Sequence, residues 1–160
     1  MKISSMETGD IRAGDAKFAI IACRFNGDIV SNLLSGAKGT LKKNGVAEES
    51  IDTIYVPGAF EIPVTAAHLA NTKKYAAIIA LGCVIRGDTP HFDFVAGECA
   101  RGILNVSLAT GVPIIFGVLT TDTPEQAHAR SQKNGENKGV DSALCALEMG
   151  NTIKSIQAAT

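Results

Sequence analysis

Short apolar runs alternate along the chain with longer segments in which apolar residues recur at helical spacing. Four such runs cover residues 17–23, 51–56, 75–85 and 112–119. Alternation of this kind is typical of α/β proteins. Some runs, such as the one that begins at Ala77, are almost continuously apolar, which strands of a parallel sheet covered by helices on both faces require. The pattern therefore predicts a three-layer α/β/α sandwich built on a doubly wound parallel sheet.

Three of the intervening segments predict helices. The first has apolar residues at i, i+3, i+4, i+7 and i+11 and stops at the pair Asn44-Gly45, which suits a helix C-terminus. The second lies between the third and fourth runs and ends near Gly111. The last begins near Val140, and its pattern weakens past Gly150. Ile3 and its neighbours are compatible with an additional edge strand.

The length and net charge of the chain exclude several classes of protein. A chain of 160 residues can bury one sizeable core, so we expect a single domain over 1–160. Its net charge of −1 is not the basic excess that nucleic acids or membrane surfaces usually require. The first ten residues lack the apolar stretch of a signal peptide, and no apolar run reaches the roughly 18 residues of a membrane span. These observations predict a cytosolic protein without nucleic-acid or membrane partners.

The four cysteines are widely separated, and no nearby histidine completes a metal-ligand spacing. We therefore interpret them as buried, reduced thiols, and we expect no metal. One alternative uses Cys83, at a predicted strand end, as a nucleophile. The chain lacks the Gly-x-nucleophile-x-Gly turn that such a role favours.

The loops after the apolar runs should carry the chemistry, because open parallel sheets bind ligands at the carboxyl ends of their strands. These loops bring together aromatic, acidic, basic and imidazole groups. A flat polar heterocycle needs such an aromatic face, hydrogen-bonding groups and glycines that let the backbone approach. The loops are Arg24-Phe25-Asn26-Gly27, 57–63, 86–91 and 120–124.

The loop at 87–89 has the pattern of an anion site. Thr89-Pro90 reads as an N-cap followed by the first helical residue, and Thr123-Pro124 repeats this signal with Gln126 as a capping-box residue. Free amides at a helix start suit a phosphate, although many ordinary helices begin in the same way. The cations Arg130 and Lys138 support the anion site, because Arg130 directly precedes, and Lys138 lies in, a segment, 131–139, that we predict to be too polar for the core.

His91 falls in the first turn of the predicted helix. The positive end of the helix dipole favours the neutral imidazole there, which could accept and return protons. A capping or packing role remains open for His91. For His68 and His128, both placed within helices, a structural role is the favoured interpretation.

Taken together, these loops resemble the lumazine synthase (6,7-dimethyl-8-ribityllumazine synthase) family. The resemblance extends from about residue 17 to about residue 150. It rests on five blocks, which are Arg24-Phe25-Asn26, the segment 56–63 (Val-Pro-Gly-Ala-Phe-Glu-Ile-Pro), the segment 81–87 (Leu-Gly-Cys-Val-Ile-Arg-Gly), the segment 116–121 (Phe-Gly-Val-Leu-Thr-Thr) and Asn137-Lys138-Gly139.

The resemblance implies a flavodoxin-like fold and a role for each matching residue. The pyrimidine substrate stacks on Phe25, and the sugar phosphate lies at Asp88, Thr89 and Arg130. His91 transfers protons. The pyrimidine edge and its ribityl chain contact Ala59, Phe60, Glu61, Cys83, Val84 and Ile85. The groups that reach the site from the adjacent subunit are Phe116, Arg130 and Lys138, and the acidic residue near the histidine is Asp141.

Some positions depart from the family pattern. Cys83 stands where Thr is common, Asp88-Thr89-Pro90 lies in a variable stretch, and Asp141 stands where Glu is frequent. Asn134-Gly135-Glu136 stands where Lys-Ala-Gly is common. No proposed functional group is lost. The first departure puts in doubt a hydroxyl contact at that strand end, and the last changes a predicted interface loop.

The implied reaction condenses 5-amino-6-(D-ribitylamino)uracil with 3,4-dihydroxy-2-butanone 4-phosphate and needs no metal or redox cofactor. The implied partners are these two small molecules and further copies of the chain in a pentameric ring. Many family members pack such rings into an icosahedral shell of about 60 chains, and the sequence leaves ring and shell open. Two other classes are a flavodoxin-like module that binds a flavin and a shell protein without catalysis. The joint presence of Phe25, Glu61, His91, Arg130 and Lys138 argues against the second.

Overall fold

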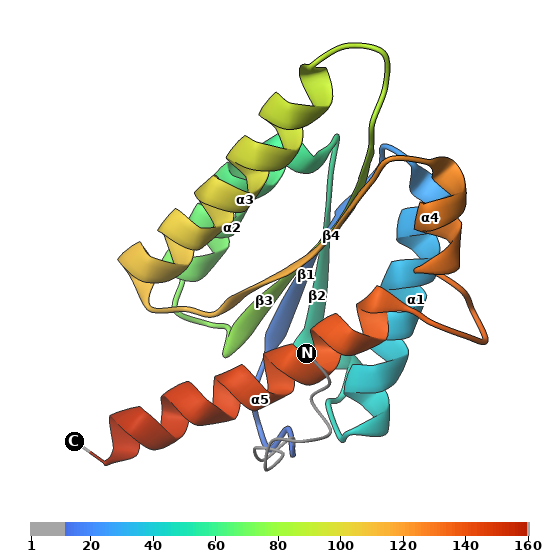
Figure 1. The fold of residues 1–160 in the computed structure, drawn as a ribbon. Helices are drawn as coiled ribbons and strands as arrows, with labels where there is room; N and C mark the ends of the chain where they lie inside the picture. Colours follow the sequence, from blue (N-terminus) through green and yellow to red (C-terminus); the bar gives the residue numbers. More distant parts are fainter. Residues whose placement is uncertain (1–11, 160) are drawn as a thin grey trace.

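A computed structural model describes residues 12–159 of the chain. At its centre is a parallel sheet with the strand order β2-β1-β3-β4 (Figure 1). The strands are β1 (Phe18–Cys23), β2 (Ile51–Val56), β3 (Ala77–Ile85) and β4 (Ile114–Thr121). All six residues of β1 are buried, because the strand is central and both of its faces are covered. Each strand lies within two residues of its predicted limits.

Helices cover both faces of this sheet and complete three layers (Figure 1). One face carries α2 (Ile62–Asn71) and α3 (His91–Thr110), and the other carries α1 (Gly27–Lys43) and α5 (Lys138–Ala158). Short elements fill the connections: η2 (Glu48–Ser50), η3 (Ala59–Glu61) and α4 (Pro124–Ala129). The three-layer, doubly wound, flavodoxin-like fold predicted from the sequence is confirmed.

The predicted helix ends are found close to the expected residues. Asn44 caps α1, and Gly45 follows with φ +96°; Gly111 caps α3 in the left-handed conformation at φ +73°. The last helix does not weaken at Gly150. That glycine is buried against Ala76, so its small size serves helix packing and α5 continues to Ala158.

The prediction that segment 131–139 is too polar for the core is wrong at its two ends. Ser131 and Asn137 are buried and form an isolated antiparallel bridge. Asn137 Oδ1 accepts from the amides of Gly139 and Val140, and its Nδ2 donates to the carbonyl of Asn32 at 3.0 Å. These polar groups are tolerated inside because they have hydrogen-bond partners.

Two further findings concern the limits of the fold. The edge strand expected near Ile3 lies outside the described residues. Within 12–159, no helix combines the length and apolar character that a membrane crossing needs.

Candidate active site

A cleft of about 740 Å³ opens where β1, β2 and β3 end. The loops after these three strands supply its walls, as expected for a parallel sheet. It is lined by many of the residues predicted from the sequence, namely Phe25, Ala59, Phe60, Glu61, Cys83, Val84, Ile85, Thr89 and His91.

Aromatic side chains dominate the rim of the cleft. Phe25 is 72% exposed and Phe60 is 60% exposed, so neither contributes much to the core. Phe92 and Phe94, from the first turn of α3, also line the cleft and were missed in the sequence analysis. The sequence carried a signal for them, since both follow His91 within one helical turn and neither belongs to the buried stripe of that helix. Exposed rings around a cleft suit stacking against a flat ligand.

Hydrogen bonds hold the polar wall in position. The amide of Gly58 donates to Oε2 of Glu61 at 3.1 Å, which orients this carboxylate and leaves its second oxygen able to accept from a ligand. Asn26, in the left-handed conformation, donates from Nδ2 to the carbonyl of Cys83 at 2.9 Å. This bond ties the loop carrying Phe25 to the end of β3, so two walls of the cleft are joined.

The loop that precedes α3 contains the predicted anion site. The helix begins at His91 and Pro90 is its N-cap, one residue later than predicted. Thr89 still takes part in the helix start, because its Oγ1 accepts from the His91 amide at 3.4 Å. Gly87, Thr89 and His91 line the cleft, while the exposed Asp88 between them does not.

A second cavity, of about 560 Å³, holds most of the other predicted residues. It runs along the edge strand β4 and the start of α5, and it is lined by Phe116, Arg130, Lys138 and Asp141. The Lys138 ammonium lies 3.1 Å from Glu136 and 3.2 Å from Asp141, and hydrogen bonds to these carboxylates raise the pKa of Lys138. Within one chain, the predicted site residues other than Asp88 therefore divide between two separate cavities.

The cysteines have the character of core thiols. All four are free; Cys23, Cys83 and Cys99 are buried, as predicted, while Cys145 is half-buried. Burial, with a smaller effect of the Asp28 charge, raises the pKa of Cys83 to about 11. The thiol is therefore protonated at neutral pH, which disfavours the alternative in which Cys83 is a nucleophile.

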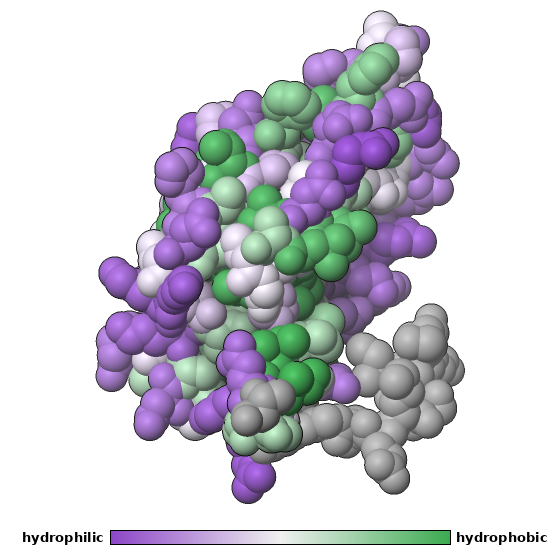
Figure 2. Space-filling model, turned by 90° about the vertical axis from the view of Figure 1, so that its left-hand side faces the viewer, coloured by the Kyte–Doolittle hydropathy of each residue, from purple (hydrophilic) through white to green (hydrophobic). Residues whose placement is uncertain are grey.

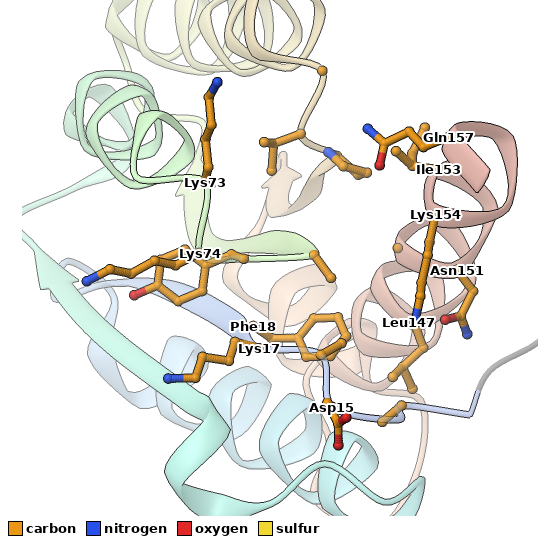
Figure 3. A pocket seen from close by; sticks show the side chains of 18 of the residues that line it. Asp15, Lys17, Phe18, Lys73, Lys74, Leu147, Asn151, Ile153, Lys154 and Gln157 are labelled. Carbon is orange, nitrogen blue, oxygen red and sulfur yellow. The ribbon is translucent and has the colours of Figure 1, made fainter. Parts of the chain in front are cut away.

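A third cavity, also of about 740 Å³, lies at the opposite end of the sheet, beside the amino ends of β1 and β3 (Figure 3). Phe18 forms part of its floor and α5 forms one side, while Lys17, Lys73 and Lys74 extend away from its centre. None of the predicted site residues lines it. Because doubly wound sheets bind ligands at strand carboxyl ends, the cleft around Phe25 is the candidate active site.

A flavodoxin-like sheet with an aromatic, hydrogen-bonding cleft at its carboxyl end is typical of proteins that bind small molecules. A sequence model of the family described as 6,7-dimethyl-8-ribityllumazine synthase matches residues 15–154. The chain belongs to this family, and the resemblance seen in its loops is confirmed. The family consists of transferases of riboflavin biosynthesis, so the chain is an enzyme of that class.

Proposed function

We propose that this chain is a 6,7-dimethyl-8-ribityllumazine synthase. It condenses 5-amino-6-(D-ribitylamino)uracil with 3,4-dihydroxy-2-butanone 4-phosphate and releases phosphate and water. The observation that carries the proposal is the cleft itself, where Phe25, Glu61 and His91 from three different segments line one cavity. The substrates, the residue roles and the assembly are all part of this proposal.

The uracil derivative occupies the wall formed by the loops after β1 and β2. Its ring stacks on Phe25, which is exposed and held by the Asn26 hydrogen bond to the end of β3. Its ribityl hydroxyls donate to the Glu61 carboxylate, which the Gly58 amide already orients. The segments Ala59–Glu61 and 83–85 contact its polar edge.

The sugar phosphate binds at the start of α3. The amides around Asp88 and Thr89 lie at the positive end of a long helix, which attracts an anion. Arg130, from the second cavity, supplies the balancing charge. Phe116, Lys138 and Asp141 accompany Arg130 in that cavity and complete the same site.

The reaction needs proton transfers and a good leaving group. The free amine of the pyrimidine attacks the ketone carbon, and loss of water leaves an imine. A proton next to the imine is removed as the carbon–oxygen bond to phosphate breaks. The resulting enol tautomerises to a ketone, the ribitylamino nitrogen attacks this carbonyl carbon to close the second ring, and a second water is lost. His91, at the rim of the cleft, carries these protons, while alignment of the two substrates contributes the larger share of the acceleration.

The active unit is a homo-oligomer in which each site is built from two chains. The division of the site residues between two cavities supports this arrangement, since one chain alone does not gather them. Exposed apolar side chains support it too: Val64, Leu104 and Leu108 are each more than half exposed, and apolar groups interrupt the polar surface over α2 and α3 (Figure 2). The assembly is a pentameric ring, alone or packed into a shell, of chains that each form one domain around a single core.

An assay with both substrates tests the activity. The purified protein should produce a fluorescent lumazine and release inorganic phosphate, and it should make nothing when either substrate is omitted. Tight uptake of riboflavin phosphate without any product would instead identify a flavin-binding module and overturn the proposal.

Mixing two variants tests the shared site. His91→Ala and Arg130→Ala remove groups that line different cavities of the chain. After co-refolding in equal amounts, about a quarter of the sites in a head-to-tail ring should combine two intact halves, so activity should exceed that of either variant alone. If mixed rings whose composition has been confirmed show no more activity than either variant alone, the site is not built from two chains.

A further inference from the structure

Arg86, the first residue after β3, bridges two loops through its side chain. Its Nε lies 3.1 Å from Oδ1 of Asp122, and its Nη1 lies 3.2 Å from Oδ1 of Asp93. The guanidinium carbon also lies 4.3 Å from the ring centroid of Phe92. The partners come from separate segments, since Phe92 and Asp93 belong to the first turn of α3 while Asp122 follows β4.

These contacts close the backbone around the predicted anion site. The segment 87–91 lies between Arg86 and the two α3 residues that its side chain contacts. Arg86 itself is anchored at the sheet, because its amide donates to the carbonyl of Thr121 at 2.9 Å. Asp122 is anchored in turn, since its amide donates to Oε1 of Gln126 at 2.8 Å. Closing a short loop at both ends reduces the number of conformations it can adopt.

Arg86 is absent from the lining of the cleft, whereas Gly87, Thr89 and His91 line it. Its guanidinium is directed to carboxylates, and the hydrogen bond to Asp122 is the main reason why the pKa of Arg86 is raised. The guanidinium of Arg86 therefore stays charged. It contacts the segment whose residues line the cleft, although Arg86 does not line the cleft itself.

We propose that Arg86 is a positioning residue, which clamps the 87–91 loop between α3 and the β4–α4 connection and so sets the relative position of the phosphate-binding amides and His91. This inference rests on the proposed function, because the loop positions substrate and proton carrier only if the cleft performs that reaction. Arg86 is well suited to the role, since a planar guanidinium can bridge two carboxylates and stack on a ring at the same time. A lysine ammonium cannot make all three contacts.

Kinetics of three variants test the clamp: Arg86→Met, Arg86→Lys and Asp122→Asn. Arg86→Met should lower kcat/KM for the sugar phosphate about 10- to 100-fold, because small displacements of reacting groups are costly. Arg86→Lys should restore little of this loss. Binding of the pyrimidine should stay unchanged in all three variants, since Phe25 and Glu61 are held by other contacts. Lys42→Met is a matched control. It breaks the ion pair between Lys42 and Glu48, which is about as exposed as the Arg86 ion pairs but lies far from the cleft.

The double variant Arg86→Met/Asp122→Asn separates positioning from direct phosphate binding. If Arg86 positions the loop through Asp122, the two losses should overlap, and the double variant should be little worse than Arg86→Met alone. Losses that multiply, or an Asp122→Asn variant as active as the wild type, would overturn the proposal.

Amide hydrogen exchange provides a readout that does not depend on catalysis. Arg86→Met should speed exchange at 87–93 and leave β1 and β3 protected. Faster exchange with unchanged kinetics would overturn the positioning role while the proposed function stands. If the wild-type protein makes no lumazine, the proposed function is wrong. If Arg86→Met also leaves amide exchange at 87–93 unchanged, Arg86 does not clamp the loop either.

Discussion

Gly139, the second residue of α5, packs directly against the carbonyl group of Leu33 in α1, so that a β-carbon at this position would overlap the carbonyl oxygen. Asn137, two residues earlier, makes a similar contact with α1. A β-carbon added to Gly36 of α1 would lie only 2.6 Å from the Oδ1 of Asn137. The start of α5, which carries Lys138 and Asp141, is therefore placed by close helix packing.

Replacing Gly139 by alanine should destabilise the fold. The added methyl group has no space, so the free energy of unfolding should fall by about 1–3 kcal/mol or more. Gly39→Ala is the matched control: it lies in α1, where the new methyl group would meet no other atom within 4 Å, and it should stabilise the helix by about 0.5–1 kcal/mol. Urea denaturation measures both, and equal stabilities would contradict the tight contact.

Removing the ring of Phe25 should weaken pyrimidine binding. The side chain is largely exposed, so Phe25→Ala should leave stability almost unchanged while binding loses about 1–3 kcal/mol, as for other base-stacking contacts. Calorimetric titration with the uracil derivative measures the loss. Tyr55→Ala, which removes an exposed ring outside the cleft, should bind normally. Equal affinity in the two variants would count against stacking on Phe25.

His91→Ala should slow product formation without abolishing it. Loss of a proton carrier typically costs about 10²- to 10⁴-fold in kcat, and substrate alignment by the rest of the cleft persists. Stopped-flow fluorescence of the lumazine product measures the rate. His68→Ala, on an exposed position of α2, should match the wild type. A variant at position 91 with full activity would exclude His91 as the proton carrier.

Arg130→Ala should mainly impair use of the phosphorylated substrate. We expect a raised KM for the sugar phosphate and weaker competition by inorganic phosphate, with unchanged pyrimidine affinity, because the lost group is a counter-charge for the anion. Lys133→Ala is a suitable control, since this exposed lysine lies in the following loop and lines neither cavity. Unchanged kinetics in Arg130→Ala would refute the anion assignment.

Alkylation should show that Cys83 is a core thiol. Because burial raises its pKa to about 11, the thiolate is scarce at pH 7.5 and increases only as the pH approaches that value. Iodoacetamide at pH 7.5 should leave Cys83 unmodified in the folded protein and activity intact, while urea-unfolded chain should react at every cysteine. Rapid modification of Cys83 with parallel loss of activity would revive the nucleophile alternative.

The sequence by itself determined the elements and the chemistry at their ends. Uninterrupted apolar runs predicted strands such as β1, because a strand covered on both faces has no polar side to reveal. Gly45 and Gly111 predicted helix ends, because left-handed backbone is easiest for glycine. The blocks around Phe25, Glu61 and His91 carried the family resemblance, since each is short and local.

Only the tertiary structure decided how those pieces meet. Periodicity shows which side of an element faces inward, but it does not show which loops adjoin, since this depends on the strand order and helix packing. Three findings depend on which segments adjoin in space. They are the burial of Ser131, the presence of Phe92 in the cleft and the bridge from Arg86 to Asp122. The division of the predicted residues between two cavities has the same origin, because β4 lies at the edge of the sheet with Arg130 and Lys138 beside it.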